Sequence, residues 1–182
     1  MTPKQVLIEE LRQHALAIGD VTLTSGATAS YYVDAKRAIL RPRGFLALGE
    51  LVREFAEEVG ATAVGGTTMG ADPVACSALA AGFDGTAFFV RKEAKQHGLQ
   101  RRIEGPFLSA GDRCVVVEDI VTTGGSTLLS IEALEAEGHE IVGVISVLDR
   151  LAGGAARIEA AAGAPYRACS TIDDVYPDRP DR

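Results

Sequence analysis

Short apolar runs separated by helical patterns dominate the chain from residue 61 onward. Apolar runs of roughly four to eight residues are typical of buried strands, and apolar residues three and four positions apart are typical of amphipathic helices. The runs predict strands at 61–64, 86–90, 114–117, 141–148 and 166–170. The helical patterns predict helices at 73–81, at 155–162 and between Thr127 and Gly138. Strands that alternate with helices in this way predict an α/β fold with a doubly wound, mostly parallel sheet.

The segment before residue 61 follows a different pattern. Apolar residues at helical spacing predict a helix over 3–18, which Gly19 would end. Two short strands are expected at 21–24 and 31–34, and a second long helix at 42–59. In a doubly wound sheet, ligands bind beyond the carboxyl ends of the strands, so the loops that follow the later strands are the candidates for function.

The most informative of these loops follows the apolar run at 114–117. Two acids, Glu118 and Asp119, stand where that strand should end, and the polar turn 122–127 leads into a helix. A strand, a Gly/Thr-rich turn and a helix start form an anion site, because the N–H groups of the first helical turn lack internal partners. Carboxylates repel a phosphate, so Glu118 and Asp119 must face another part of the ligand, such as sugar hydroxyls or an accompanying cation.

A second candidate loop carries a concentration of positive charge. Segment 91–102 has a local charge of +4, whereas the whole chain carries −7. Such a charged segment is often only a solvated surface loop, but here the run Phe88-Phe89-Val90 leads into it directly from a buried strand. The loop continues to Gly105 without apolar periodicity, as mobile lids do. This cluster on an acidic protein indicates a small anionic ligand.

Composition excludes several classes of protein. With 47% apolar and 24% charged residues the chain is globular, and its net charge of −7 argues against non-specific nucleic-acid binding. No apolar run approaches the roughly 20 residues of a membrane span, and the N-terminus lacks a signal-peptide core. Three widely spaced cysteines suit a reducing cytosol. We therefore expect one cytoplasmic domain, 1–182, with a frayed polar tail at 178–182.

The turn at 122–127 fits neither the P-loop pattern nor the dinucleotide fingerprint. An apolar strand, two acids, two apolar residues and T-T-G-G-S instead resemble the signature of the type I phosphoribosyltransferases. The resemblance implies a loop for the 5-phosphate of phosphoribosyl pyrophosphate (PRPP), with both acids near the ribose 2- and 3-hydroxyls. The PRPP-binding residues implied by this motif are Glu118, Asp119, Ile120, Val121, Thr122, Thr123, Gly124, Gly125 and Ser126.

The basic segment narrows the resemblance. Its pattern R-K-x-x-K-x-H-G is similar to the catalytic loop of the orotate phosphoribosyltransferases, and adenine and hypoxanthine enzymes lack it. The resemblance implies that the pyrophosphate of PRPP is contacted by Arg91, Lys92, Lys95 and His97. Arg91, Lys95, His97 and Asp119 are the implied catalytic residues. The family's loop closes over the active site, and its first lysine, here Lys92, serves the partner subunit of a homodimer.

The resemblance also extends to a base site. Thr24-Ser25-Gly26 and the segment 30–33 resemble the family's orotate-lining segment in a small N-terminal hood, which implies contacts from Tyr32 and Val33. Arg150 matches the arginine for the orotate carboxylate, and Thr122 an orotate-contacting threonine. Segment 65–70 matches the pyrophosphate-binding loop, whose glycines would allow close backbone approach.

Two positions depart from this pattern. Many members carry lysine where this chain has Thr24, and some carry lysine where it has Met69. Both lysines face PRPP or the pyrimidine in those members. Their absence removes positive charge, which bears on affinity more than on identity.

The resemblance implies transfer of the 5-phosphoribosyl group from PRPP to orotate, giving orotidine 5-phosphate and pyrophosphate in pyrimidine biosynthesis. Mg²⁺ should arrive on PRPP, with Asp119 reaching it through water, because the sequence offers no all-protein cage. Two alternatives stay open: a phosphoribosyltransferase for another base, and a regulator that senses PRPP or a nucleotide without turnover. We expect no nucleic-acid or membrane partner.

Overall fold

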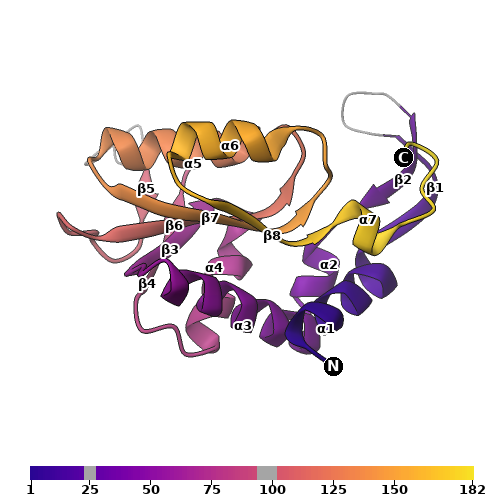
Figure 1. Cartoon of the computed structure of the whole chain (residues 1–182), viewed down its shortest axis with the longest axis horizontal. Coiled ribbons are helices and arrows are strands. Elements are labelled where there is room, and N and C mark those ends of the chain that lie inside the picture. Colours follow the sequence, from indigo (N-terminus) through magenta and orange to yellow (C-terminus); the bar gives the residue numbers. More distant parts are fainter. Residues whose placement is uncertain (23–27, 94–101) are drawn as a thin grey trace.

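The computed structural model describes residues 1–22, 28–93 and 102–182 (Figure 1). Its centre is a six-stranded sheet in the order β5-β4-β3-β6-β7-β8. Five strands run parallel, and the short β5 pairs antiparallel with β4. The strands are β3 (Ala63–Thr67), β4 (Thr86–Val90), β5 (Ile103–Glu104), β6 (Arg113–Val121), β7 (Glu140–Asp149) and β8 (Tyr166–Thr171). The predicted doubly wound, mostly parallel sheet is confirmed.

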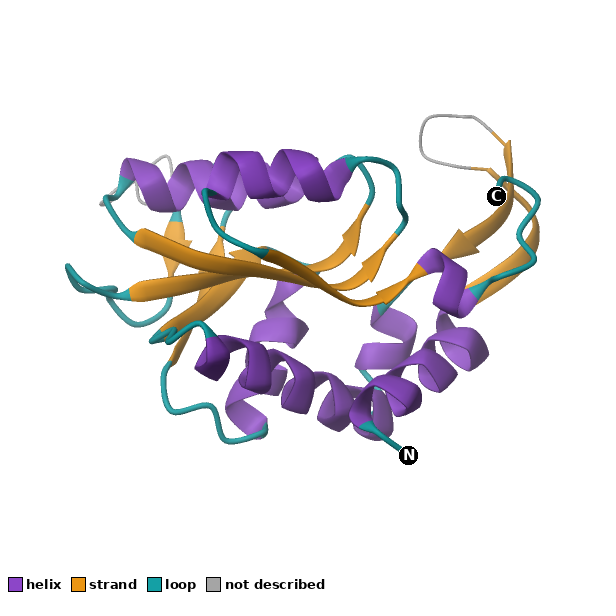
Figure 2. Cartoon of the chain, in the orientation of Figure 1, coloured by secondary structure: helices purple, strands orange, loops and turns teal. Residues whose placement is uncertain are grey.

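Helices cover both faces of this sheet (Figure 2). On one face lie α5 (Gly125–Ala136) and α6 (Gly154–Ala162). On the other face lie α3 (Pro42–Glu58) and α4 (Ala71–Ala80). Each face has its own apolar cluster, and β6 contributes to both: Val115 and Val117 belong to one, Cys114 and Val116 to the other. This two-sided burial explains why the strand is an unbroken apolar run.

A smaller unit, the hood, stands at one end of the sheet (Figure 1). Its elements are α1 (Pro3–Glu10), the π-helical turn η1 (Leu11–Ala15), β1 (Leu16–Thr22), β2 (Thr28–Val33) and α2 (Lys36–Ile39). Strand β1 pairs antiparallel with β2. The C-terminal helix α7 (Ile172–Val175) lies beside this hairpin in Figure 1. Within the described residues, the hairpin forms a separate two-stranded sheet.

The helix predicted over 3–18 was too long. Helical structure ends at Ala15, and residues 16–18 pair with 31–33 in the hairpin. Leu11 and Ala15 are fully buried and complete the apolar side of the helix, whereas Ile18 is 66% exposed. The helical spacing of Ile18 was therefore coincidental, and cross-strand hydrogen bonding determines its conformation.

Other boundaries also differ from the predictions. Strand β6 continues through Val121, because Glu118 and Ile120 still pair with Ser146 and Leu148 of β7; the two acids are therefore inside the strand. Strand β3 is shifted to Ala63–Thr67, two residues later than predicted at its start. The structure also contains β5, α2 and α7, which were not predicted and span only two to four residues.

The C-terminal tail, which we expected to fray, lies against the hood. The hydroxyl of Tyr31 donates a hydrogen bond of 3.0 Å to Oδ2 of Asp181. Arg179 also forms ion pairs with Asp173 and with Asp181. Within the described part of the chain, no helix combines the length and apolar character needed to cross a membrane.

Candidate active site

Two adjoining cavities lie at the carboxyl ends of β3 and β6, where a doubly wound sheet binds its ligands. The loop cavity, of about 250 Å³, is lined by Glu118, Ile120 and the turn 122–127. The central cavity, of about 520 Å³, is lined by Lys36, Thr67, Thr68, Met69, Gly70, Lys92, Glu118, Asp119 and Ser126. Glu118 and Ser126 line both cavities, so one extended ligand could occupy the two together.

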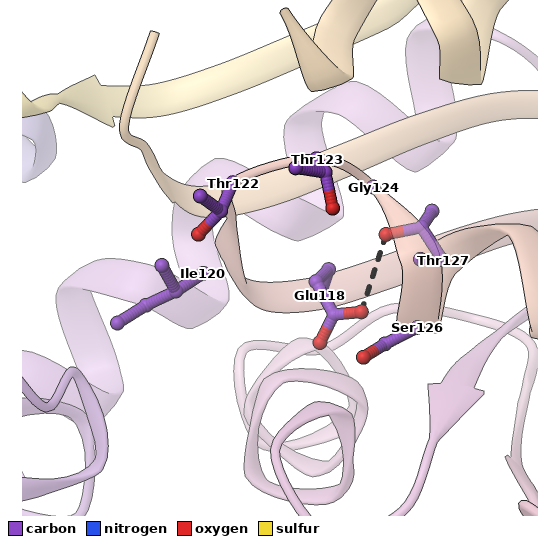
Figure 3. A pocket seen from close by; sticks show the side chains of 8 residues that line it. Glu118, Ile120, Thr122, Thr123, Gly124, Ser126 and Thr127 are labelled. Atoms are coloured by element: carbon purple, nitrogen blue, oxygen red, sulfur yellow. Dashed lines mark hydrogen bonds between the residues drawn. The ribbon is translucent and has the colours of Figure 1, made fainter. Parts of the chain in front are cut away.

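The turn of the loop cavity is built for an anion (Figure 3). Gly124 adopts a left-handed conformation with φ +83° and leads directly into α5, which begins at Gly125. The first N–H groups of α5 have no acceptor within the helix and are available to a phosphate. Helix α6 holds the turn in place. Thr122 O accepts a hydrogen bond from Gly154 N at 3.1 Å, and Thr123 O accepts one from Arg157 Nη1 at 2.7 Å.

Glu118 is the most buried acid of the site, with 4% of its surface exposed. Thr127 Oγ1 donates to its Oε2 at 3.2 Å (Figure 3). The backbone N–H of Asp119 donates to its Oε1 at 3.2 Å. Burial, together with the neighbouring charge of Asp119, raises the pKa of Glu118. The neutral carboxyl of Glu118 therefore persists to higher pH than that of an ordinary glutamate.

Asp119 is held between the sheet and the hood. Its Oδ2 lies 3.2 Å from Nζ of Lys36, and Ile120 N donates to its Oδ1 at 2.8 Å. A Cβ atom on Gly70 would lie 2.5 Å from Oδ1 of Asp119. Only glycine at position 70 therefore leaves room for the carboxylate in this position.

The predicted loop 65–70 divides into two parts. Gly65 and Gly66 belong to the buried strand β3, and a Cβ on Gly66 would lie 2.1 Å from Val117 O. These two glycines serve strand packing, so the predicted loop begins later than expected, at Thr68. Thr67 is also buried and pairs with Ser130 at 2.6 Å. The part that extends beyond the strand is Thr68–Gly70, in which Met69 is 73% exposed.

The structure describes only part of the predicted basic site. Lys92 lines the central cavity of its own chain. Arg91 directly follows β4, and its Nη1 lies 3.6 Å from Glu104 Oε1; it is not among the residues that line either cavity. Lys95 and His97 lie outside the described residues, as does Thr24 of the predicted orotate segment.

The predicted base-site residues come from strand β2, from the turn after β6 and from the position that follows β7. Arg150 follows β7, and its Nη2 donates a 2.9 Å hydrogen bond to the hydroxyl of Tyr31, whose ring lies 5.1 Å from the guanidinium carbon. Side chains alternate along β2, so Tyr31 and Val33 are buried while Tyr32 is 41% exposed. The side chain of Val33 packs in the apolar core, and its backbone pairs with Leu16 of β1.

Comparison with known proteins decides the family. A family model for the phosphoribosyl transferase domain matches residues 43–162. A protein from Corynebacterium glutamicum strain R, called orotate phosphoribosyltransferase, is 49% identical over 170 residues, which cover 93% of this chain and 91% of the relative. The chain belongs to the phosphoribosyltransferase family. The resemblance stated from the sequence is thereby confirmed.

Solved structures of phosphoribosyltransferases agree with this placement. Orotate phosphoribosyltransferase of Mycobacterium tuberculosis H37Rv, in complex with Fe(III) dicitrate, is 44% identical with a TM-score of 0.87, over 96% of this chain and 99% of the other. The same enzyme in complex with PRPP is 39% identical with a TM-score of 0.81, over 95% of this chain and 98% of the other. The chain thus shares its fold with a family member whose structure was solved with PRPP.

The acid pair of the site is the group of side chains that could face a metal ion carried by a substrate. Among the described residues, no group of three His, Cys, Asp or Glu side chains could hold a metal ion. The acid pair offers oxygen atoms, and one oxygen of Asp119 faces Lys36. Mg²⁺ prefers oxygen ligands and retains several waters, so a water-mediated contact with Asp119 suits this donor set.

Sequence reasoning missed three residues that this phosphoribosyltransferase places at the site. Lys36 contacts Asp119, Tyr31 contacts Arg150, and Arg157 donates to Thr123 O in the turn 122–127. The doublet Tyr31-Tyr32 carried a partial signal, because strand alternation requires that only one of the two faces inward. Nothing in the local sequence indicates the partner of Lys36 or of Arg157.

Proposed function

We propose that the chain is an orotate phosphoribosyltransferase, which transfers the 5-phosphoribosyl group from PRPP to orotate and forms orotidine 5-phosphate and pyrophosphate in pyrimidine biosynthesis. The observation that carries this proposal is the junction of the two cavities at Glu118 and Ser126. One cavity offers N–H and hydroxyl donors, and the other combines the acid pair with the ammonium groups of Lys36 and Lys92. A sugar with a phosphate at one end and a pyrophosphate at the other requires both environments.

PRPP would lie across both cavities. Its 5-phosphate occupies the loop cavity, where the first-turn N–H groups of α5 and the hydroxyls of Thr123 and Ser126 are the donors. Glu118 and Asp119 receive the ribose hydroxyls. Thr68–Gly70 and Lys92 lie on the pyrophosphate side of the central cavity. Arg91, Lys95 and His97 complete the pyrophosphate contacts in this proposal.

Orotate would bind between the hood and the turn 122–127. A guanidinium suits a planar carboxylate because it can bind it in a bidentate manner, which gives Arg150 its role. Nη2 of Arg150 is already bonded to Tyr31, and this contact orients the group. Thr122, Tyr32 and the backbone of Val33 are the other proposed contacts.

The reaction joins a ring nitrogen of orotate to C1 of the ribose, breaks the C1–O bond to pyrophosphate and releases the proton of that nitrogen. Positive charge grows on the ribose while negative charge grows on the leaving group, so catalysis consists mainly of positioning and electrostatic stabilisation. The acid pair stands where the cationic character develops. Lys95, Arg91 and His97 stabilise the pyrophosphate, and a closed basic loop keeps water away from the ribosyl cation. Mg²⁺ bound to PRPP would neutralise part of the pyrophosphate charge.

The proposal also covers the location, the domain organisation and the oligomeric state of the enzyme. It is a cytoplasmic, single-domain protein that works as a homodimer, and Lys92 of each subunit serves the site of the other. Lys92 lines the cavity of its own chain in the structure, which makes the shared site a specific question for experiment.

The test is an assay of pyrophosphate release from PRPP and Mg²⁺ with orotate, uracil, adenine and hypoxanthine in parallel. The proposal requires turnover with orotate and little with the other bases. Turnover with another base would favour the alternative that Thr24 and Met69 support, and PRPP binding without any turnover would favour a sensing regulator.

A further inference from the structure

Lys36 is a cation of the central cavity that comes from the hood and not from the sheet. It is the first residue of α2, directly after the hairpin. Its Nζ lies 3.0 Å from Oδ1 of Asp34 and 3.2 Å from Oδ2 of Asp119. The side chain of Lys36 is 38% exposed, and that of Asp119 is 14% exposed. Lys36 thus links the hood to one of the two acids on which the proposed ribose site depends.

Asp34 anchors Lys36. Oδ1 of Asp34 also accepts the backbone N–H of Lys36 at 3.2 Å, and the backbone N–H of Asp34 donates to Ala15 O at 3.0 Å. Burial by itself would lower the pKa of Lys36, but the hydrogen bonds and charges of Asp34 and Asp119 outweigh it and raise the pKa. The ammonium therefore stays charged at neutral pH. Two of its three N–H donors face these acids, which leaves the third for an anion that enters the cavity.

The balance of charges in the central cavity suggests a role for the Lys36 ammonium in binding an anion. Glu118 and Asp119 line the central cavity, and the cations of the described residues that line it are Lys36 and Lys92. Met69, where some family members carry a lysine, is exposed on the same cavity but has no charge. An anionic substrate such as PRPP is repelled by the two carboxylates. A cation beside them reduces this repulsion and so favours binding.

We propose that Lys36 is a further PRPP-binding residue: Asp34 holds its ammonium beside Asp119, where it compensates the acid pair and binds the pyrophosphate-bearing end of PRPP. This inference rests on the proposed use of PRPP. Some family members have a lysine at the position of Met69. In this chain, Lys36 of the hood would supply that positive charge instead. An ordinary ion pair at a helix start would stabilise the fold slightly and leave substrate affinity unchanged.

The chain offers a matched control in the next residue. Arg37 lies on the same short helix, is exposed, and does not line the central cavity. Lys36→Met and Arg37→Met each remove one positive charge from α2. Lys36→Arg keeps the charge, and Lys36→Gln keeps a donor for Asp34 and replaces Lys36→Met if that variant does not fold.

The experiment measures steady-state constants for both substrates and equilibrium binding of Mg²⁺–PRPP by calorimetry. Lys36→Met should raise the KM and the Kd for PRPP by about 10-fold or more, the loss of one charge-assisted contact, while the KM for orotate changes less than about threefold. Lys36→Arg should recover most of the affinity, and Arg37→Met should match the wild type.

Unchanged PRPP affinity in folded Lys36→Met would overturn the proposal. Equal losses for PRPP and orotate together with a lower melting temperature would also overturn it, since they indicate a structural role. The wild-type assay separates this question from the proposed function. If the wild type binds PRPP but does not use orotate, the orotate assignment fails, and Lys36 is judged from the PRPP binding constants alone.

Discussion

The guanidinium of Arg150 rests on Tyr31, with Nη2 donating a 2.9 Å hydrogen bond to the phenol oxygen across 119 positions of sequence. The same oxygen donates onward to Asp181. Arg150 is thus part of a polar chain that includes a hood strand and the C-terminal tail. The proposed base site therefore depends on three distant segments and not on the strand end alone.

Arg150→Ala should raise the KM for orotate much more than that for PRPP. Loss of a charge-assisted hydrogen bond costs about 1.5–3 kcal/mol, or about 10- to 150-fold in affinity. Steady-state kinetics with each substrate varied in turn measures the difference. Arg167→Ala is the matched control, because Arg167 pairs with Glu58 on the surface. Equal effects on both substrates, or wild-type turnover of uracil, would contradict the role of Arg150.

Tyr31→Phe keeps the ring under Arg150 and removes the hydroxyl that orients it. The lost contact orients Arg150 and does not touch orotate itself, so we expect an effect the size of one ordinary hydrogen bond, about 0.5–1.5 kcal/mol, and a KM for orotate that rises by about 2- to 12-fold. The KM for PRPP should stay near the wild-type value. Tyr166→Phe removes another phenol oxygen, one that pairs with Ser146, and should leave both constants unchanged. An unaltered orotate KM in Tyr31→Phe would show that Arg150 needs no support from Tyr31.

The raised pKa of Glu118 predicts a particular dependence of stability on pH. Between the ordinary glutamate pKa, about 4.3, and the raised one, the folded state holds a proton that the unfolded chain has lost. The free energy of unfolding therefore falls as pH rises through this window, by up to about 1.4 kcal/mol per pH unit. Glu118→Gln has no such proton and lacks this loss.

Urea unfolding of wild type and Glu118→Gln, from about pH 5 upward, tests this prediction. The difference in unfolding free energy should shift in favour of the variant as pH rises. Glu50→Gln, which removes the same charge from an exposed position of α3, reports the effect of net charge alone. A difference between Glu118→Gln and wild type that stays constant with pH would refute the raised pKa.

Mixing Lys92→Ala with Arg150→Ala tests the shared active site. If Lys92 serves the partner subunit, one site of each heterodimer carries both lesions and the other carries none. Random exchange of equal amounts should then restore roughly a quarter of wild-type activity in a two-fold dimer. Mass spectrometry of the mixture confirms that subunits have exchanged. No recovery after exchange would mean that Lys92 acts in the site of its own chain, whose cavity it lines.

Strand β6 shows which features could be predicted from sequence. The run Cys114–Val117 is buried on both faces, so its apolar character is unbroken and the strand is easy to recognise. Glu118 is nearly as buried, but because glutamate is an acidic residue it was predicted to lie at the end of the strand. Its partner Thr127 lies nine positions away in α5, and this hydrogen bond compensates the burial. The acids and the turn could be predicted, but not how far the strand extends.

Contacts between the hood and the sheet could not be predicted. Lys36 reaches Asp119 across 83 positions, and Tyr31 reaches Arg150 across 119. Such pairs depend on how the hairpin packs beside the sheet, and this packing leaves no periodic signal in either segment. The failure at Ile18 has a related cause. A helical spacing can continue by chance beyond the point where tertiary pairing begins to determine the backbone.

The contact between Tyr31 and Asp181 also sets an order of events during synthesis. The two residues are separated by 150 positions, and Arg12 likewise donates to the carbonyl oxygen of Asp174 from 162 positions away. A ribosome releases the N-terminal segment first, but these contacts must wait until the tail has emerged. The sheet from β3 to β7 can form before that moment. The hood is made first, yet its contacts with the tail are therefore among the last of the protein to form.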